Sequence, residues 1–153
     1  MTDLPRPAPD FALPADDGAE ITLAGLRGTP FVFFFYPRDN TPGCTKEAIA
    51  FTTLKPDFDA LGVRIFGISK DSLKSHGNFR EKQNLAIGLL SDAETEVCEA
   101  FGVWQEKKNY GKTYMGIVRS TFLVDASGQI VAEWTNVKVD GHAEEVLTAA
   151  GAL

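Results

Sequence analysis

The sequence predicts an α/β domain with a central mixed β-sheet, helices on both faces of the sheet and an N-terminal extension. Residues 31–36 (Phe-Val-Phe-Phe-Phe-Tyr) form a continuous apolar run, which is typical of a strand buried on both faces. Strand and helix patterns then alternate, and a short polar turn at 125–128 separates the last two strands. This order favours parallel pairing followed by a hairpin. A length of 153 residues with 44% hydrophobic content suits a single domain spanning 1–153.

The N-terminal half predicts an extended segment, a short strand and one long helix. The extended segment comes first, because four of residues 1–14 are prolines, and an alternating strand at 20–23 follows a turn. A helix begins at Pro42, and its apolar residues recur at steps of three and four until Gly62. Pro56 lies inside this helix and is expected to kink or divide it, because proline removes a backbone donor.

The C-terminal half predicts further strands and helices around a polar loop. Ser91 and Glu94 match a capping box, which predicts a helix from this point to Phe101. The other elements follow from apolar runs, alternation and helical spacing. They are strands at 63–68, 87–90, 120–124 and 129–134, helices at 73–83 and 143–150, and a long polar loop at 105–116.

One cysteine lies where the apolar strand gives way to the long helix. Pro42 suits the first helical position and Thr41 suits the N-cap, so Cys44 falls in the first turn. Unpaired backbone N–H groups and the positive end of the helix dipole favour a thiolate there. Free cysteines are more often buried as small hydrophobic side chains. Here turn-forming residues surround the cysteine, and this favours a reactive nucleophile.

Composition and charge argue against several function classes. The formal charge of −6 and the isoelectric point near 4.9 disfavour nucleic acid or an anionic membrane as a partner. No apolar stretch approaches the roughly 18 residues of a membrane span, and the N-terminus lacks a signal-peptide pattern. Two cysteines do not make a disulfide scaffold, which favours a reducing cytoplasm. His76 and His142 lack companion cysteines, so we expect solvated surface histidines, no metal site and no cofactor.

The segment around Cys44 resembles the active-site segment of the peroxiredoxins, in particular the peroxiredoxin Q (bacterioferritin comigratory protein) branch. The family pattern is Pro, three residues, Thr or Ser, two residues and Cys, and it is met at Pro37, Thr41 and Cys44. The resemblance covers nearly the whole chain. Further similar segments lie at 89–92, 101–104, 111–114, 116–117 and 119–123. The resemblance implies a thioredoxin-like fold and a thiol peroxidase activity on hydrogen peroxide and organic hydroperoxides.

The resemblance also implies a role for each residue of the site. Cys44 would attack the peroxide and become a sulfenic acid. Arg119 and Thr41 would bind the thiolate and the peroxide through their donors, and backbone N–H groups near Gly43 and Cys44 would complete the cradle. Pro37 would shield the thiolate from bulk water.

The chain departs from its branch in the second, resolving cysteine. Many members carry it five positions after the first, where this chain has Ile49, and others carry it on the following helix, where 73–83 has none. The other thiol, Cys98, lies beside Val97 and Phe101, which favours a buried structural cysteine. A one-cysteine cycle with an external thioredoxin- or glutaredoxin-type reductant is therefore preferred. A two-cysteine cycle with Cys98 as resolving thiol is the alternative.

Two other functional classes share these features. A thiol–disulfide oxidoreductase would have the same fold, but the chain lacks the Cys-x-x-Cys motif that such chemistry normally uses. A peroxide sensor, redox relay or holdase would need the same reactive thiolate, so the sequence leaves this alternative open. Sustained turnover with a thiol reductant would distinguish a peroxidase from a sensor that is oxidised once. We expect a cytoplasmic protein that is a monomer or a weak homodimer.

Overall fold

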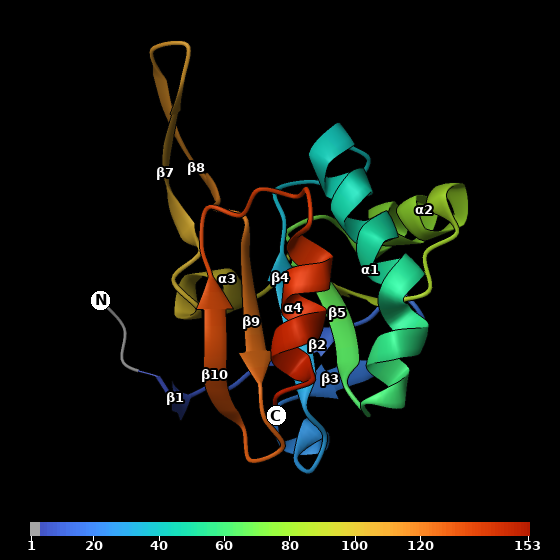
Figure 1. Cartoon of the computed structure of the whole chain (residues 1–153). Helices are drawn as coiled ribbons and strands as arrows, with labels where there is room; N and C mark the ends of the chain where they lie inside the picture. The colour runs from blue at the N-terminus through green and yellow to red at the C-terminus, as the bar shows by residue number, and fades with distance from the viewer. Residues whose placement is uncertain (1–3) are drawn as a thin grey trace.

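A six-stranded mixed sheet forms the centre of the computed structural model, which describes residues 4–153 (Figure 1). The central strand β4 pairs in parallel with β5 and antiparallel with β9, so the sheet is mixed, as the sequence predicts. In spatial order the strands are β1 (Arg6–Pro7), β10 (Gln129–Trp134), β9 (Ser120–Val124), β4 (Phe31–Phe35), β5 (Arg64–Ser69) and β6 (Gly88–Ser91).

The sheet is covered on both faces, and strand β4 shows why its sequence is apolar throughout. Its side chains alternate between two buried clusters, so every residue of the strand lies in a core. One face packs against α1 (Pro42–Ala60), α2 (Leu73–Gln83) and α4 (His142–Ala150). The other face packs against α3 (Val97–Ala100), η1 (Ala24–Leu26) and the small sheet of β2 (Ala12–Pro14) and β3 (Glu20–Thr22). The predicted fold class, with helices on both faces, is confirmed.

The long helix α1 runs without interruption, so the expected division at Pro56 is wrong. Phe51 and Phe58 lie on either side of the proline and are both fully buried in the same cluster. Their packing keeps the two halves in one helix, although the proline removes one backbone hydrogen bond.

The predicted capping box is also wrong. Ser91 ends strand β6, and its hydroxyl donates to the Asp71 carbonyl instead of capping a helix. The helix that follows, α3, has only four residues and begins at Val97. Asp92 supplies its cap, because its two carboxylate oxygens accept the backbone N–H groups of Val97 at 3.0 Å and Cys98 at 2.8 Å.

The segment predicted as a polar loop is a β-hairpin made of β7 (Trp104–Asn109) and β8 (Lys112–Ile117). Tyr110 and Gly111 both have positive φ, +51° and +75°, which is the two-residue turn that suits the twist of a hairpin. The hairpin forms a sheet of its own and projects from the body of the protein (Figure 1). Because most of its residues are exposed on both faces, it lacks the apolar alternation that marks a strand.

Both histidines are buried, which contradicts the expectation of solvated surface side chains. His76 Nδ1 lies 2.7 Å from Asp39 Oδ2, and its Nε2 lies 2.8 Å from the Leu90 carbonyl oxygen. Both partners accept, so both ring nitrogens donate and His76 is a cation. Burial is the largest single influence and opposes this charge, but the hydrogen bond to Asp39, the Asp39 charge and the bond to the Leu90 carbonyl together outweigh burial and raise the pKa of His76. His142 Nε2 lies 2.8 Å from Thr121 Oγ1, and burial lowers its pKa.

No helix within residues 4–153 has the length and apolar character needed to cross a membrane.

Candidate active site

Cys44 lies where strand β4 leads into helix α1, as the sequence predicts. Thr41 occupies the N-cap position with extended φ and ψ of −88° and 153°, and Pro42 is the first helical residue. Cys44 is therefore the third residue of the helix, and it is buried, with 1% of its surface exposed. The Thr41 hydroxyl donates to the Arg38 carbonyl at 2.9 Å and makes no cap bond, so its lone pairs are free to accept from a ligand.

Arg119 contacts the sulfur of Cys44 directly. It lies between β8 and β9, and its Nη2 donates to Cys44 Sγ at 3.2 Å. This contact places a permanent cation directly against the sulfur. Gly43 leaves room for this contact, because a Cβ at that position would lie only 3.2 Å from Arg119 Nη2. A side chain there would displace the guanidinium from the sulfur.

Glu47 is a buried member of the site that the sequence analysis missed. Its Oε1 accepts from Arg119 Nη1 at 2.7 Å, so Arg119 joins the carboxylate to the sulfur. Glu47 is 1% exposed, and its Oε2 has no hydrogen-bond partner among the described residues. Burial raises the pKa of Glu47 to about 7, although the Arg119 charge opposes the rise. The sequence feature that could have identified Glu47 as a site residue is its position one helical turn after Cys44, on the helix face that also carries Ala48.

The raised pKa of Glu47 predicts a pH-dependent stability. The folded state holds the proton up to about pH 7 and the unfolded state only up to about 4.5, so the free energy of unfolding falls as pH rises between these values. The full effect is about 3 kcal/mol. Because Glu47→Gln lacks this titration, the variant should gain stability relative to the parent by that amount between about pH 4 and about pH 8.

Urea unfolding of both reduced proteins at several pH values measures this difference. Glu94→Gln, an exposed carboxylate, is the matched control and should show no comparable trend. A stability difference between Glu47→Gln and the parent that does not change with pH would contradict the raised pKa.

Two pockets that share Pro37 and Lys107 border the site, and Cys44 itself lines neither of them. Pro37 and Arg119 line the first, which has a volume of about 430 Å³. Pro37 and Thr41 line the second, of about 510 Å³, and Lys107 of the hairpin lines both. The structure thus brings Pro37, Thr41, Gly43, Cys44 and Arg119 to one end of the sheet, with space for a small molecule beside them.

Cys98 does not lie in this site. It is fully buried in the cluster that covers the opposite face of the sheet from Cys44. Burial and the neighbouring Asp92 carboxylate raise the pKa of the Cys98 thiol strongly. Both properties agree with the predicted structural cysteine, and both cysteines are free.

The loop before helix α1 is held by a buried polar network centred on Asp39. Its Oδ1 accepts from the Tyr36 hydroxyl at 2.6 Å, and its backbone N–H donates to Asp71 Oδ2 at 2.8 Å. Together with the His76 contact, these bonds tie the loop to β4, β5 and α2. Asp39, Asp71 and His76 offer possible metal-ligand atoms within 4.8 Å of one another. These groups already bond to one another, so a metal ion would have to break the network.

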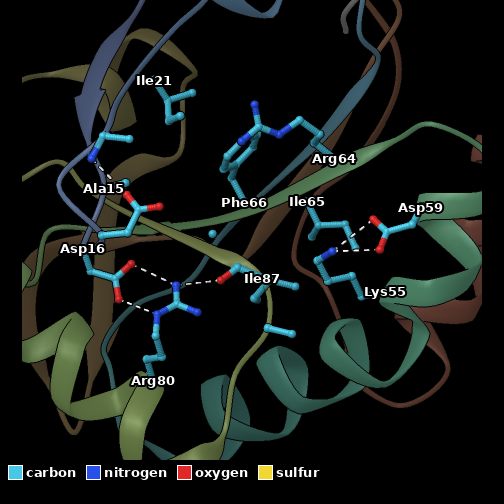
Figure 2. A pocket seen from close by; sticks show the side chains of 14 residues that line it. Ala15, Asp16, Ile21, Lys55, Asp59, Arg64, Ile65, Phe66, Arg80 and Ile87 are labelled. Carbon is cyan, nitrogen blue, oxygen red and sulfur yellow. Dashed lines mark hydrogen bonds and ion pairs between the residues drawn. The ribbon is translucent and has the colours of Figure 1, made fainter.

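A third pocket, of about 460 Å³, lies at the opposite end of the sheet (Figure 2). Two nitrogens of Arg80 donate to the two carboxylate oxygens of Asp16, at 2.5 and 2.9 Å. The Arg64 guanidinium lies over the Phe66 ring, 4.8 Å from its centroid. No residue of the Cys44 site lines this pocket.

Comparisons with known proteins agree with this geometry. Residues 4–133 match the AhpC/TSA family. The chain is 49% identical to peroxiredoxin Bcp of Xanthomonas campestris, over 97% of this chain and 96% of that protein. It is 47% identical to peroxiredoxin Bcp of Bacillus subtilis, over 95% of this chain and 92% of that protein.

Solved structures give the same result for the fold. A structure of the X. campestris bacterioferritin comigratory protein superposes with a TM-score of 0.88 at 47% identity, over 93% of this chain and 90% of that one. A cysteine-to-serine variant of Xylella fastidiosa PrxQ superposes with a TM-score of 0.89 at 37% identity, over 99% and 98%. The predicted thioredoxin-like fold is thereby confirmed. The chain belongs to the AhpC/TSA family and, within it, to the Bcp or peroxiredoxin Q branch of the peroxiredoxins, and it is a thiol peroxidase.

Proposed function

We propose that this chain reduces hydrogen peroxide and organic hydroperoxides through a sulfenic acid on Cys44. The observation that carries the proposal is the 3.2 Å contact from Arg119 Nη2 to Cys44 Sγ in the first turn of a helix. The bacterioferritin comigratory protein of X. campestris is described as having alkyl peroxide reduction activity, which supports organic hydroperoxides as a substrate class.

The chemical step needs a nucleophile and donors aimed at the peroxide. The Cys44 thiolate attacks one peroxide oxygen, the O–O bond breaks, and the departing oxygen takes a proton to leave as water or an alcohol. Arg119 and the backbone N–H groups of Gly43 and Cys44 stabilise the charge that develops, and Thr41 binds the peroxide. Pro37 lines the pocket beside them and limits access of bulk water.

We further propose a one-cysteine cycle with an external thioredoxin- or glutaredoxin-type thiol. A first thiol condenses with the Cys44 sulfenic acid, giving a mixed disulfide and water. A second thiol attacks that disulfide, releasing the Cys44 thiolate and an oxidised reductant. Within the chain, Ile49 stands at the near position for a resolving thiol, and Cys98 lies across the sheet.

Two free thiols suit a reducing cytoplasm, and we propose that the chain acts there as one domain, a monomer or a weak homodimer. It uses no metal or other cofactor in the proposed cycle.

Stoichiometric peroxide tests the cycle. One equivalent should give a sulfenic acid at Cys44 that a dimedone-type trap captures. Excess peroxide without reductant should advance it to the sulfinic acid, because no internal thiol intercepts it. Mass spectrometry of peptides prepared without reductant follows both products. A dominant disulfide between Cys44 and Cys98 within one chain would contradict the one-cysteine cycle and assign Cys98 as the resolving thiol.

A further inference from the structure

The β7–β8 hairpin forms a separate sheet and pairs with no other strand of the described residues. A two-stranded hairpin is only marginally stable in water when nothing covers it. This one exposes Tyr110, Tyr114 and Met115 by 96%, 46% and 52%. Large apolar side chains on a projecting hairpin indicate a surface that a partner covers.

The register of the hairpin divides its side chains into two faces of different charge. Residues directly opposite each other share a face, and successive residues alternate. One face, the basic face, carries Gln105, Lys107, Asn109, Lys112, Tyr114 and Gly116. It holds two lysines and an aromatic ring and has no carboxylate. The opposite face carries Glu106, Lys108, Thr113 and Met115.

The charge of the hairpin contrasts with that of the chain. Its residues 104–117 have a net charge of +2, whereas the chain as a whole has −6. None of Lys107, Lys108 and Lys112 forms an ion pair with a carboxylate in the described part of the chain. The basic face therefore presents uncompensated positive charge to a partner.

The hairpin borders the pocket beside the site. Lys107, Tyr114 and Gly116 of the basic face line the pocket of about 510 Å³ together with Pro37 and Thr41, and Trp104, Met115 and Ile117 of the opposite face line it as well. Gly116 allows Lys107 and Tyr114 to pack closely on this side of the pocket, because a Cβ at position 116 would lie 3.0 Å from Lys107 Cδ and 3.4 Å from the Tyr114 ring. Arg38 adds a cation on the other side of the same pocket. Lys70 also lines this pocket, but it is paired with Asp92 and Glu99, and Asp71 places a carboxylate there.

We propose that the basic face docks the thiol reductant, a protein or peptide whose reactive cysteine is flanked by carboxylates. The proposal rests on the proposed function, in which an external thiol reduces the Cys44 sulfenic acid. Docking places the reductant thiol at the mouth of the pocket, where its sulfur condenses with the sulfenic sulfur and releases water. A second copy of this chain fits less well, because its thiols are buried and it would close the pocket.

Synthetic peptides with a defined charge test this docking. Each probe carries one central cysteine, flanked by four glutamates in one peptide and by four glutamines in the other. The protein is first oxidised with one equivalent of peroxide, and mixed disulfide formation is then followed by quenched-flow mass spectrometry. The glutamate peptide should react faster at low salt, and about 0.5 M NaCl should remove most of the difference.

Variants on the two faces of the hairpin show where the peptide docks. Lys112→Glu should lower the ratio of the glutamate rate to the glutamine rate by about fivefold or more. Lys108→Glu changes the charge equally but on the opposite face, and should change the ratio by less than about twofold. Using the ratio cancels the different intrinsic reactivities of the two peptide thiols.

Four results would overturn the docking proposal. The first is equal rates for the two peptides after correction for intrinsic reactivity, and the second is equal effects of the two lysine variants. The third is a preference for the glutamate peptide that survives high salt. The fourth is a Lys112→Glu effect confined to sedimentation, which would assign the basic face to self-association.

Reaction with dithiothreitol keeps the docking proposal separate from the proposed cycle. If Cys44 forms no sulfenic acid and no disulfide even with this small thiol, the proposed cycle fails; if only the charge preference is absent, the docking surface fails.

Discussion

Cys44→Ser should reduce peroxide consumption to the uncatalysed rate, whereas Cys98→Ser should retain most of the activity. Only Cys44 combines a position in the first turn of a helix with an Arg119 contact at 3.2 Å. A serine hydroxyl in its place is neither ionised at neutral pH nor easily oxidised, so no sulfenic acid forms. Cys98 is fully buried on the other side of the sheet, and its pKa is strongly raised.

Peroxide consumption with dithiothreitol as reductant measures both variants, and it bypasses any protein reductant. Circular dichroism establishes that each variant is folded. Should a buried serine at position 98 destabilise the protein, Cys98→Ala gives the same comparison with an apolar side chain. Comparable loss of activity in folded variants at both positions would contradict the assignment of Cys44 as the sole nucleophile.

The central elements were predictable because local pattern and tertiary packing agree there. The run at 31–36 is apolar at every position since its side chains alternate between two cores. The strands 120–124 and 129–134 have the predicted bounds because each lies in the sheet beside a short polar turn. The junction at Cys44 was predictable because the residues before and at the start of α1 determine where a helix begins.

The wrong or missed predictions fall where local hydrophobic patterns give no signal. The hairpin at 104–117 has no buried face, so no hydrophobic period marks it. His76 is buried because Asp39, far away in the chain, neutralises it. Glu47 was missed since a buried carboxylate is recognisable only once Arg119 is placed beside it. Each of these positions depends on a pairing that local sequence patterns do not encode.

Ionisation of Cys44 alone cannot account for catalysis, and this is why Arg119 carries the second large prediction. An ordinary cysteine is already a few per cent thiolate at neutral pH, so full ionisation gains about thirtyfold, or about 2 kcal/mol. Enzymes commonly supply about 8 kcal/mol or more. The remainder has to come from orienting the peroxide and stabilising the departing oxygen, for which fixed donors are required.

Arg119→Met should therefore lower the rate of Cys44 oxidation by about 10²–10³-fold. Stopped-flow oxidation measures this rate, and alkylation of Cys44 across pH measures the thiolate fraction separately. Arg38→Met is the matched control, since it removes an exposed arginine from the loop before α1 and leaves the sulfur contact intact. Thr41→Val should cause a smaller loss, because it removes one neutral hydroxyl.

Arg119→Met also leaves Glu47 buried without its one hydrogen-bond partner among residues 4–153, so the Glu47 carboxyl should stay protonated to higher pH. Arg119→Met combined with Glu47→Gln removes that group, and the rate of the double variant should stay as low as that of the single one. Recovery of the rate in the double variant would mean that an unpaired carboxyl, and not a missing donor, slows the single variant. A rate that fell only in proportion to the thiolate fraction would show that Arg119 acts on the ionisation of Cys44 alone and not on the transition state.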